Sequence, residues 1–388
     1  MNAPLHAADR PSAAPALAGA AAQASSVRHI ALVGPLPPPS GGMANQALQL
    51  SGLLREAGIA VDFVQTNAPY RPAWAGKLRG VRALFRIVPY MAALWRAAGR
   101  AQVFHVMANS GWSWHLFAAP AIWIAHLRGT PVVVNYRGGE AANFLKQAAA
   151  WMRPSLRRCA ALAVPTGFLA HVFGQHGIGT VIVPNIVNLE RFSASAAPRT
   201  PGGLRLLVAR NLEDIYDNAS ALRAFALVRE SYPDAQLTVA GSGPLRADLE
   251  QLARELGLAQ AVHFTGRVDT AGMPDLYRNA DIMLNPSLID NTPNSVLEAL
   301  ASGTLVVSTN VGGVPYVAED GKTALLVPPA DPAAMAQAVL RLAGDPALAA
   351  ALREAGRASV AQYAWSSVKP RLLDVYRQAL ASKGGRRP

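Results

Sequence analysis

The sequence predicts an α/β protein of two doubly wound domains that face each other across a cleft, followed by C-terminal helices. Three observations predict this fold class. Short apolar runs alternate with helix-length segments along almost the whole chain, as in parallel sheets covered on both faces. A stretch of small residues, Pro and Gly, SASAAPRTPGG, interrupts the alternation after Phe192. The length of 388 residues suits two to three domains of about 150 residues each.

The expected strands follow the uninterrupted apolar runs. In the first half they are His29–Val33, Val61–Gln65, Val103–Met107, Val132–Tyr136, Ala161–Val164 and Val181–Val183. Helical patterns lie between them, at Met43–Glu56, Leu78–Ala98 and Phe168–Gln175. In the second half the expected strands are Leu204–Ala209, Gln236–Ala240, Val262–Thr265, Asp281–Asn285, Leu305–Ser308 and Ala324–Val327. The last 60 or so residues have a wholly helical pattern.

These elements predict five segments of the chain. Residues 1–27, rich in Ala, Pro and Ser, are expected to be a disordered leader, because no apolar stretch in them is long enough for a signal peptide. We expect an N-terminal domain at 28–193, a linker at 194–203 and a C-terminal domain at 204–365. Residues 366–388 are expected to form a helix that packs back on the N-terminal domain, with a basic tail.

Composition and charge restrict the class of protein. Hydrophobic residues make up 51% of the chain and charged residues 15%, which excludes wholesale disorder, and the single Cys159 excludes a disulfide scaffold. The apolar run Trp112–Leu127 is shorter than the roughly 20 residues of a membrane span, so we expect a buried or interfacial helix there. The net charge of +12 lies entirely in residues 1–193. This imbalance favours an anionic partner: membrane lipid, a phosphorylated substrate or nucleic acid.

Two segments of the second half combine glycine with polar residues. The run VAGSGPLR at 239–246 ends a strand and opens a helix, and Gly241 and Gly243 would let the backbone turn tightly beside an anionic ligand or serve the turn alone. A dinucleotide site would need a third glycine where Arg246 stands, which disfavours NAD. In DNTPNSVLEALASG, Asp290 and Glu298 bracket a helix start, where they could grip the hydroxyls of a sugar and a ribose, or be an N-cap and a surface residue.

In their order along the chain, these motifs resemble glycosyltransferase family 4, the retaining enzymes of GT-B fold that use nucleotide-sugar donors. The donor half matches through VAR at 208–210, VAGSGP at 239–244, VHFTGRV at 262–268, the loop and helix just described, and the long run at 306–331. The first half matches more loosely, through GPLPPPSGGM at 34–43 and VPNIVNLERF at 183–192. The resemblance covers about residues 28–380.

The resemblance implies roles for particular residues. Asp290 falls on the first member of the family's acidic pair, which contacts the donor sugar and is usually Glu, and Glu298 on the second, which holds the ribose. Arg210 falls on the Arg that grips the diphosphate; Ile215 stands where the family has Lys, so Arg267 or another cation is expected to substitute. The family's N-domain His is absent from NYRGGEA, where Arg137 stands. The remaining positions implied in donor binding are Gly41, Gly42, Gly241, Gly243, Val268, Thr292, Pro293, Asn294 and Ser295.

The expected chemistry requires neither a metal nor a cofactor. A departing nucleoside diphosphate develops negative charge, which Arg210 and the backbone N–H groups near Thr292–Ser295 would stabilise, aided by the loop Ser40–Met43. No Asp-x-Asp occurs that would clamp Mg²⁺ or Mn²⁺. The resemblance implies that the leaving phosphate takes the acceptor's proton, so that no side-chain base is needed.

Two further regions are open to two interpretations each. His105 and His115 flank HVMANSGWSWH, where they could touch a sugar or serve the core. In Lys77–Arg100, the apolar stripe of Leu78, Val81, Phe85 and Val88 could face the core; with the neighbouring Arg79, Arg82 and Arg86 it could instead face anionic lipid.

The sequence therefore predicts a cytoplasmic glycosyltransferase, peripheral at the inner face of the cytoplasmic membrane. Its substrates would be a nucleotide-sugar donor, with a UDP-sugar favoured, and a glycan or lipid-linked saccharide acceptor in surface polysaccharide or lipopolysaccharide synthesis. The alternatives are a nucleotide-sugar 2-epimerase of the same fold and a nucleic-acid-binding protein that uses the basic half. No RNA-recognition, KH or helix-turn-helix signature supports the last, so no nucleic-acid partner is expected.

Overall fold

The computed structural model describes residues 27–38, 41–70, 72–77, 83–194 and 203–384. Nearly all of the expected leader and most of the expected linker therefore lie outside the described residues. So do Arg79 and Arg82 of the expected lipid-facing helix.

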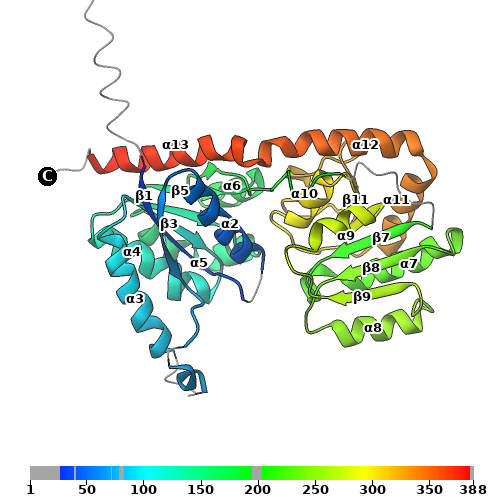
Figure 1. Ribbon diagram of the computed structural model, residues 1–388, viewed down its shortest axis with the longest axis horizontal. Coiled ribbons are helices and arrows are strands. Elements are labelled where there is room, and N and C mark those ends of the chain that lie inside the picture. Colours follow the sequence, from blue (N-terminus) through cyan, green and yellow to red (C-terminus); the bar gives the residue numbers. More distant parts are fainter. Residues whose placement is uncertain (1–26, 39–40, 71, 78–82, 195–202, 385–388) are drawn as a thin grey trace, which may run out of the picture.

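Two parallel six-stranded sheets form the two halves of the molecule (Figure 1). The first has the order β2-β1-β3-β4-β5-β6, with β1 His29–Gly34, β2 Ala60–Gln65, β3 Val103–Ala108, β4 Val132–Tyr136, β5 Ala161–Val164 and β6 Val181–Ile182. The second has the order β12-β11-β10-β7-β8-β9, with β7 Arg205–Ala209, β8 Gln236–Ala240, β9 Val262–Gly266, β10 Ile282–Asn285, β11 Leu305–Thr309 and β12 Leu325–Val327. The predicted α/β fold class is confirmed, and each expected strand agrees with the observed one to within a residue at either end.

Helices cover both faces of the first sheet. They are α2 Gly42–Glu56, η1 Ala73–Lys77, α3 Leu84–Ala98, a π-helical turn η2 Trp114–Ala118 that continues into α4 Ala119–Leu127, α5 Ala141–Leu156 and α6 Gly167–Gly174. One core cluster joins α3, α4, α5 and α6 to one face of the sheet, and another joins α2 to the opposite face. Both layers are needed because alternate residues of a buried strand point to opposite faces.

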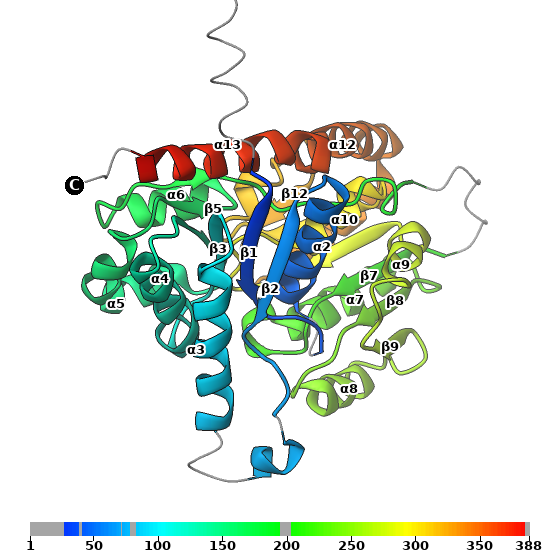
Figure 2. The same cartoon turned by 60° about the vertical axis from the view of Figure 1, so that its left-hand side comes forward.

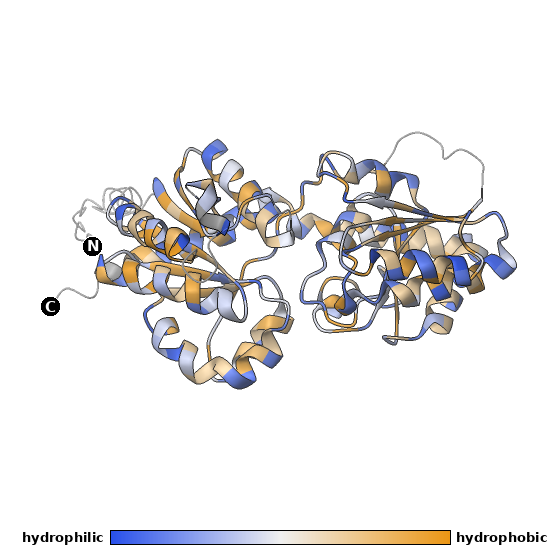
Figure 3. Ribbon diagram, turned by 90° about the horizontal axis from the view of Figure 1, so that it is seen from below, coloured by the Kyte–Doolittle hydropathy of each residue, from blue (hydrophilic) through white to orange (hydrophobic). Residues whose placement is uncertain are grey.

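The second sheet is built in the same way. Its helices are η3 Asp214–Tyr216, α7 Asn218–Ser231, α8 Arg246–Glu255, α9 Met273–Asn279, α10 Asn294–Ala301, η4 Val314–Tyr316, α11 Pro332–Gly344, α12 Pro346–Ser359, η5 Val360–Tyr363 and α13 Trp365–Gly384. Helices α7, α8, α11 and α12 share one core cluster with the sheet, whereas α9 and α10 pack on its other face. In both domains hydrophobic residues occur on the strands and on the helices that pack against them (Figure 3). None of the described helices is both long and apolar enough to cross a bilayer.

The helix expected at Leu78–Ala98 differs from the one observed. The described helix, α3, begins at Leu84, and residues 78–82 lie outside the described part. Of the expected apolar stripe, Val88 is 61% exposed and Phe85 is half-buried, so these described members do not face the core. Tyr90, Leu94, Ala97 and Ala98 are the buried positions instead.

The last helix, α13, leaves the second domain and lies along the first (Figures 1 and 2). Its residues Val368, Leu372, Val375, Tyr376 and Ala379 belong to the same core cluster as β1, β3 and α2. The Tyr376 hydroxyl lies 2.7 Å from Nδ1 of His105, a fully buried residue of β3. Burial, together with the positive charge of Arg137, lowers the pKa of His105 to about 3, so its ring is neutral. The core interpretation of His105 is therefore the correct one.

We expect Tyr376→Phe to lower the free energy of unfolding by about 1–3 kcal/mol, because it leaves Nδ1 of a buried imidazole without a partner. The Nε2 atom of His105 is already buried without one, so no second bond compensates. Urea unfolding measures the change. In a His105→Leu background the same substitution should cost much less. An equal cost in both backgrounds would contradict a hydrogen bond between the two side chains.

Candidate active site

A cleft of about 900 Å³ lies between the two domains, and both domains line it. Its walls are the loops that follow the carboxyl ends of the strands, together with the first turns of α2 and α10. In open parallel sheets, ligands bind outside the carboxyl ends of the strands where the strand order reverses. In the second sheet the order reverses between β7 and β10.

Three polar side chains meet at this reversal. Arg210 directly follows β7, Asn285 ends β10, and Asp290 lies in the loop after β10. Nε of Arg210 donates to Oδ1 of Asn285 at 2.6 Å, and its Nη2 forms an ion pair with Asp290. Both charged side chains are close to 90% buried, and the Arg210 guanidinium also lies 5.0 Å from the ring centre of Tyr216. The structure thus brings together Arg210 and Asp290, which the sequence predicted separately.

Ile215, where the family has Lys, supplies no cation to this cluster. Its carbonyl accepts the N–H of Leu288 at 2.8 Å, which fixes the loop that carries Asp290. Burial lowers the pKa of Arg210, opposed by Tyr216, Tyr277 and Glu298. Arg267, the expected substitute, lines the cleft but is exposed.

Glu298, the fifth residue of α10, lines the same cleft. Its Oε2 accepts a hydrogen bond from the Tyr277 hydroxyl at 3.0 Å. Burial raises the pKa of Glu298 to about 7, against the opposing effects of Tyr277, Arg191 and Arg210. A carboxyl group that titrates near neutral pH, aimed into a cleft, fits a residue that exchanges hydrogen bonds with a ligand's hydroxyl groups.

The amino end of α10 lines the cleft. Its N-cap, Pro293, makes no side-chain capping bond, so the first N–H groups of the helix lack that partner. The hydroxyl groups of Thr292 and Ser295 are buried without a hydrogen-bond partner, and both residues line the cleft. Ser295 is only 8% exposed. Buried hydroxyl groups left unpaired beside a helix amino end are suited to an anionic ligand.

The N-terminal domain contributes a second helix amino end. The N-cap of α2 is Gly41, which has no side chain to cap the helix. A Cβ atom on the next residue, Gly42, would lie 3.6 Å from Nδ2 of Asn294. The two helix amino ends therefore approach each other across the cleft. Arg137, which follows β4, also lines it from the N-terminal side.

Gly241 and Gly243 serve the turn itself. A Cβ atom on Gly241 would overlap the carbonyl oxygen of Arg210, and one on Gly243 would overlap that of Leu212. Gly241 also lines the cleft, as does Val268, so the tight packing brings backbone close to the ligand space.

Sequence reasoning missed several residues that shape this site. Asn285 accepts from Arg210, Tyr277 donates to Glu298, and Gly313 donates its N–H to the Asp290 carbonyl at 2.9 Å. A Cβ atom on Gly312 would overlap that same carbonyl oxygen. The two consecutive glycines of VGG, Gly312 and Gly313, are the sequence feature that could have indicated this close approach of two backbone segments.

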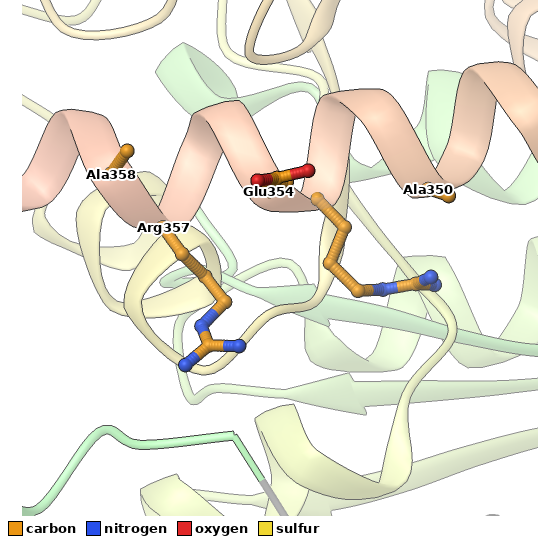
Figure 4. A pocket seen from close by; sticks show the side chains of 5 residues that line it. Ala350, Glu354, Arg357 and Ala358 are labelled. Carbon is orange, nitrogen blue, oxygen red and sulfur yellow. The ribbon is translucent and has the colours of Figure 1, made fainter.

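Other candidates do not join the site. His115 is exposed and stacks edge-on against Trp112 and Phe144, outside the cleft lining. Within the described ranges, no three His, Cys, Asp or Glu side chains are grouped so that they could hold a metal ion. A second hollow, of about 480 Å³, lies on α12 beside Glu354 and Arg357 (Figure 4). Arg353, which also lines it, donates to the Gly303 carbonyl at 2.9 Å. It contains no residue of the cleft.

Comparison with known proteins agrees with this geometry. Residues 205–345 match the family described as "Glycosyl transferases group 1", and residues 40–191 match "Glycosyltransferase Family 4". The chain is 34% identical over 217 residues to a phosphatidyl-myo-inositol mannosyltransferase of Mycobacterium leprae, an alignment that covers 54% of this chain and 56% of the relative. It is 31% identical over 227 residues to a D-inositol 3-phosphate glycosyltransferase of Streptomyces avermitilis, covering 54% and 49%. The chain thus spans about half the length of these two relatives.

A longer alignment, 26% identical over 374 residues, relates it to the phosphatidyl-myo-inositol mannosyltransferase of Mycobacterium tuberculosis and covers 89% of this chain and 95% of that one. Among solved structures, a sucrose-phosphate synthase from Thermosynechococcus elongatus superposes with a TM-score of 0.71 at 22% identity, over 92% of this chain and all of that one. Anabaena HepE in complex with UDP superposes at 0.69 with 15% identity, over 89% and 98%. Matched in both of its domains and alike in fold, the chain belongs to glycosyltransferase family 4, with the two-domain GT-B architecture.

Proposed function

We propose that this protein transfers a sugar from a nucleotide-sugar, favouring a UDP-sugar, to a glycan or lipid-linked saccharide, with retention of the anomeric configuration. The observation that carries the proposal is the convergence of Arg210, Asp290 and Glu298 with the open amino end of α10 at the strand reversal. Glu298 would hold the ribose, Asp290 the donor sugar, and Arg210 with the α10 N–H groups the diphosphate.

The sugar transfer that we propose needs no side chain to act as a base. The bond between the sugar's C1 and the oxygen of the second phosphate breaks, and its electron pair remains on that phosphate oxygen. The acceptor hydroxyl oxygen forms the new bond to C1 on the same face, and its proton passes to the departing phosphate. Arg210 and the helix N–H groups stabilise the charge that grows on the phosphate, as prearranged donors do in other transfer enzymes.

The substrate classes in this proposal are suggested by the names of the relatives and by the ligands of the structural neighbours. The mycobacterial relatives are named for mannosyl transfer to phosphatidylinositol, a lipid acceptor, and structural neighbours were solved with UDP. A lipid-linked acceptor would place the product in surface polysaccharide or lipopolysaccharide synthesis.

The test is a panel of UDP-, GDP- and ADP-sugars in which released nucleotide is measured with and without a lipid-extract acceptor. We expect release with one donor class, and turnover that persists after exhaustive EDTA treatment. Interconversion of the donor without an acceptor would identify an epimerase instead. Strict recovery by Mn²⁺ would contradict charge stabilisation by Arg210 and the helix alone.

We further propose that the protein acts in the cytoplasm, peripherally bound to the inner face of the membrane through an aromatic face on α3, α4 and α5. Exposed side chains define this face: Val88, Trp95, Trp123, Leu127 and Trp151. The helices lie side by side, and arginines join them, since Arg128 stacks on Trp95 at 4.8 Å and Arg158 on Trp123 at 3.7 Å. Between Asp62 and Glu190 the only acidic residue is Glu140. Indole rings beside arginines are typical of surfaces that meet anionic lipid headgroups.

We expect the protein to co-sediment with vesicles of phosphatidylglycerol and phosphatidylethanolamine at low salt and to dissociate as salt rises. The variant Trp95→Ser/Trp151→Ser removes apolar contact, and Arg96→Glu/Arg157→Glu reverses two exposed charges; each should lower the bound fraction several-fold. The matched control, Arg223→Glu/Arg254→Glu, which reverses two exposed charges in the second domain, should bind like the wild type. If all three variants sedimented to the same extent, the protein would bind the membrane through another surface or would not bind it at all.

A further inference from the structure

Arg137, a half-buried arginine of the cleft, differs from Arg210, because no carboxylate among the described residues pairs with it. The charge of Arg210 is offset by Asp290. The Arg137 side chain is instead held by neutral amide oxygens: Nε donates to Oδ1 of Asn135 at 3.1 Å, and Nη1 donates to Oδ1 of Asn185 and, at 3.5 Å, to Oε1 of Gln46.

The Arg137 guanidinium therefore keeps its positive charge. Burial lowers its pKa to about 10, which leaves it protonated at neutral pH. Desolvating a guanidinium is unfavourable, and amide dipoles offset that cost only in part. A half-buried positive charge that lacks a counter-ion and lines a cleft can attract an anion to that place.

Asn185 connects this arginine to the other domain. It is 4% exposed, its Oδ1 accepts from Arg137, and its Nδ2 donates to Oδ1 of Asn294 at 2.7 Å. Asn294 is the first residue of α10. Gln46 of α2 fixes the neighbouring residue, since its side chain pairs with both the N–H and the carbonyl of Ile186, at 3.1 and 2.9 Å.

A second contact ties the loop of Arg137 to the same place. The Asn291 side chain donates to the Gly138 carbonyl. A Cβ atom on Gly138 would overlap Ser110 and crowd the Tyr136 hydroxyl, so the loop sits in a fixed position between the two domains. The guanidinium of Arg137, the amino end of α10 and the amino end of α2 thus converge around Asn294.

We infer that Arg137 is the second cation that binds the donor's diphosphate, in place of the lysine that is absent at Ile215, and that Asn185 positions Arg137. This inference rests on the proposed function. The nucleoside end of the donor would lie with Glu298 in the second domain. An N-terminal-domain cation would then meet the far phosphate, the one that bears the sugar. Asn185 touches no substrate; it orients Arg137 toward the α10 amino end, so that the two anion-binding elements meet only when the domains are in this arrangement.

The test compares the binding of UDP and UMP by calorimetry, alongside GDP and GMP, at one salt concentration. Arg137→Ala should lower the preference for diphosphate over monophosphate about tenfold or more and leave UMP binding nearly unchanged. It should also lower kcat more than it raises donor KM. The side chain of Arg137→Gln can still donate to the amide oxygens that hold Arg137, but it carries no charge. This variant should lose the diphosphate preference to the same extent, which would show that the loss in Arg137→Ala does not come from misfolding. Guanidinium ion in the buffer should partly restore turnover by Arg137→Ala.

Asn185→Ala should lose a smaller part of the diphosphate preference. In Asn185→Asp the new carboxylate would pair with Arg137, so the loss should approach that of Arg137→Ala. The double variant Arg137→Ala/Asn185→Ala should match Arg137→Ala alone, because Asn185 acts through Arg137. The controls Gln175→Ala and Arg377→Ala, both exposed, should bind like the wild type.

The outcomes separate this inference from the proposed function. An unchanged diphosphate preference in folded Arg137→Ala, with donor use intact in the wild type, would overturn the role of Arg137. Additive losses in the double variant would overturn the positioning role of Asn185. A wild-type protein that binds no nucleoside diphosphate would overturn the proposed function and this inference together.

Discussion

Replacing Arg210 by alanine is expected to lower kcat about 100- to 1,000-fold while changing donor KM far less. The negative charge on the departing phosphate grows toward the transition state, so a cation aimed at it stabilises that state more than the bound substrate. Arg210 is suited to this because Asn285 and Asp290 hold two of its nitrogens, which fixes the guanidinium at the strand reversal. Steady-state kinetics with the donor identified by the panel measure both constants.

The alanine variant needs a control for folding, because it leaves Asp290 buried without its partner. Arg210→Lys keeps the charge but cannot donate to both neighbours, and we expect it to lose about 10-fold to 100-fold in kcat. Thermal melting of both variants shows whether the domain stays folded. A rise in KM alone, with kcat unchanged, would make Arg210 a uniform binding group and contradict its electrostatic role.

The fold could be predicted from local patterns. In a parallel sheet covered on both faces the strands are largely apolar, and segments such as Ile30–Val33 and Leu206–Ala209 stand out between helical segments and turns. The approximate place of the site followed as well, because loops after parallel strands gather at one edge of the sheet. Asp290 could be named from its loop and the helix start that follows it, whereas Arg210, 80 residues earlier, was implied only by the resemblance to the family.

The side-chain hydrogen bonds between distant segments could not be predicted, because they depend on how those segments pack against each other. The bond between Asn185 and Asn294 joins residues 109 apart in different domains, and that between His105 and Tyr376 joins residues 271 apart. Asn185 does not differ in local pattern from an ordinary turn residue, and Asn294 could be named only as a helix start, not as a partner of Asn185. The exposure of Val88 was equally hidden, since an apolar stripe has the same period whether it faces a core or a lipid surface.

Glu298→Gln is expected to have opposite effects on donor use and on stability. The carboxylate would accept charge-assisted bonds from the ribose hydroxyls, so the amide should lower kcat/KM for the donor about 10- to 100-fold at pH 8. Burial raises the pKa of Glu298 to about 7 in the folded protein, above the ordinary value of 4.5. The stability that this residue contributes is therefore present below pH 4.5 and lost as the pH rises through about 7. At pH 8 the unliganded variant, which has no charge to bury, should melt at a higher temperature than the wild type.

The pH dependence distinguishes this account from a surface role for Glu298. Donor affinity of the wild type should rise as the pH increases through about 7, whereas Glu298→Gln should show no such step. At pH 4, below the pKa of the carboxyl in both the folded and the unfolded protein, the two proteins should melt alike, because the wild-type carboxyl is then largely protonated and Tyr277 can donate to either side chain. The matched control, Glu250→Gln on the exposed side of α8, should change neither the melting temperature at pH 8 nor donor use. Equal melting at both pH values, together with unchanged donor kinetics, would show that Glu298 is neither a buried carboxyl nor a ligand of the donor.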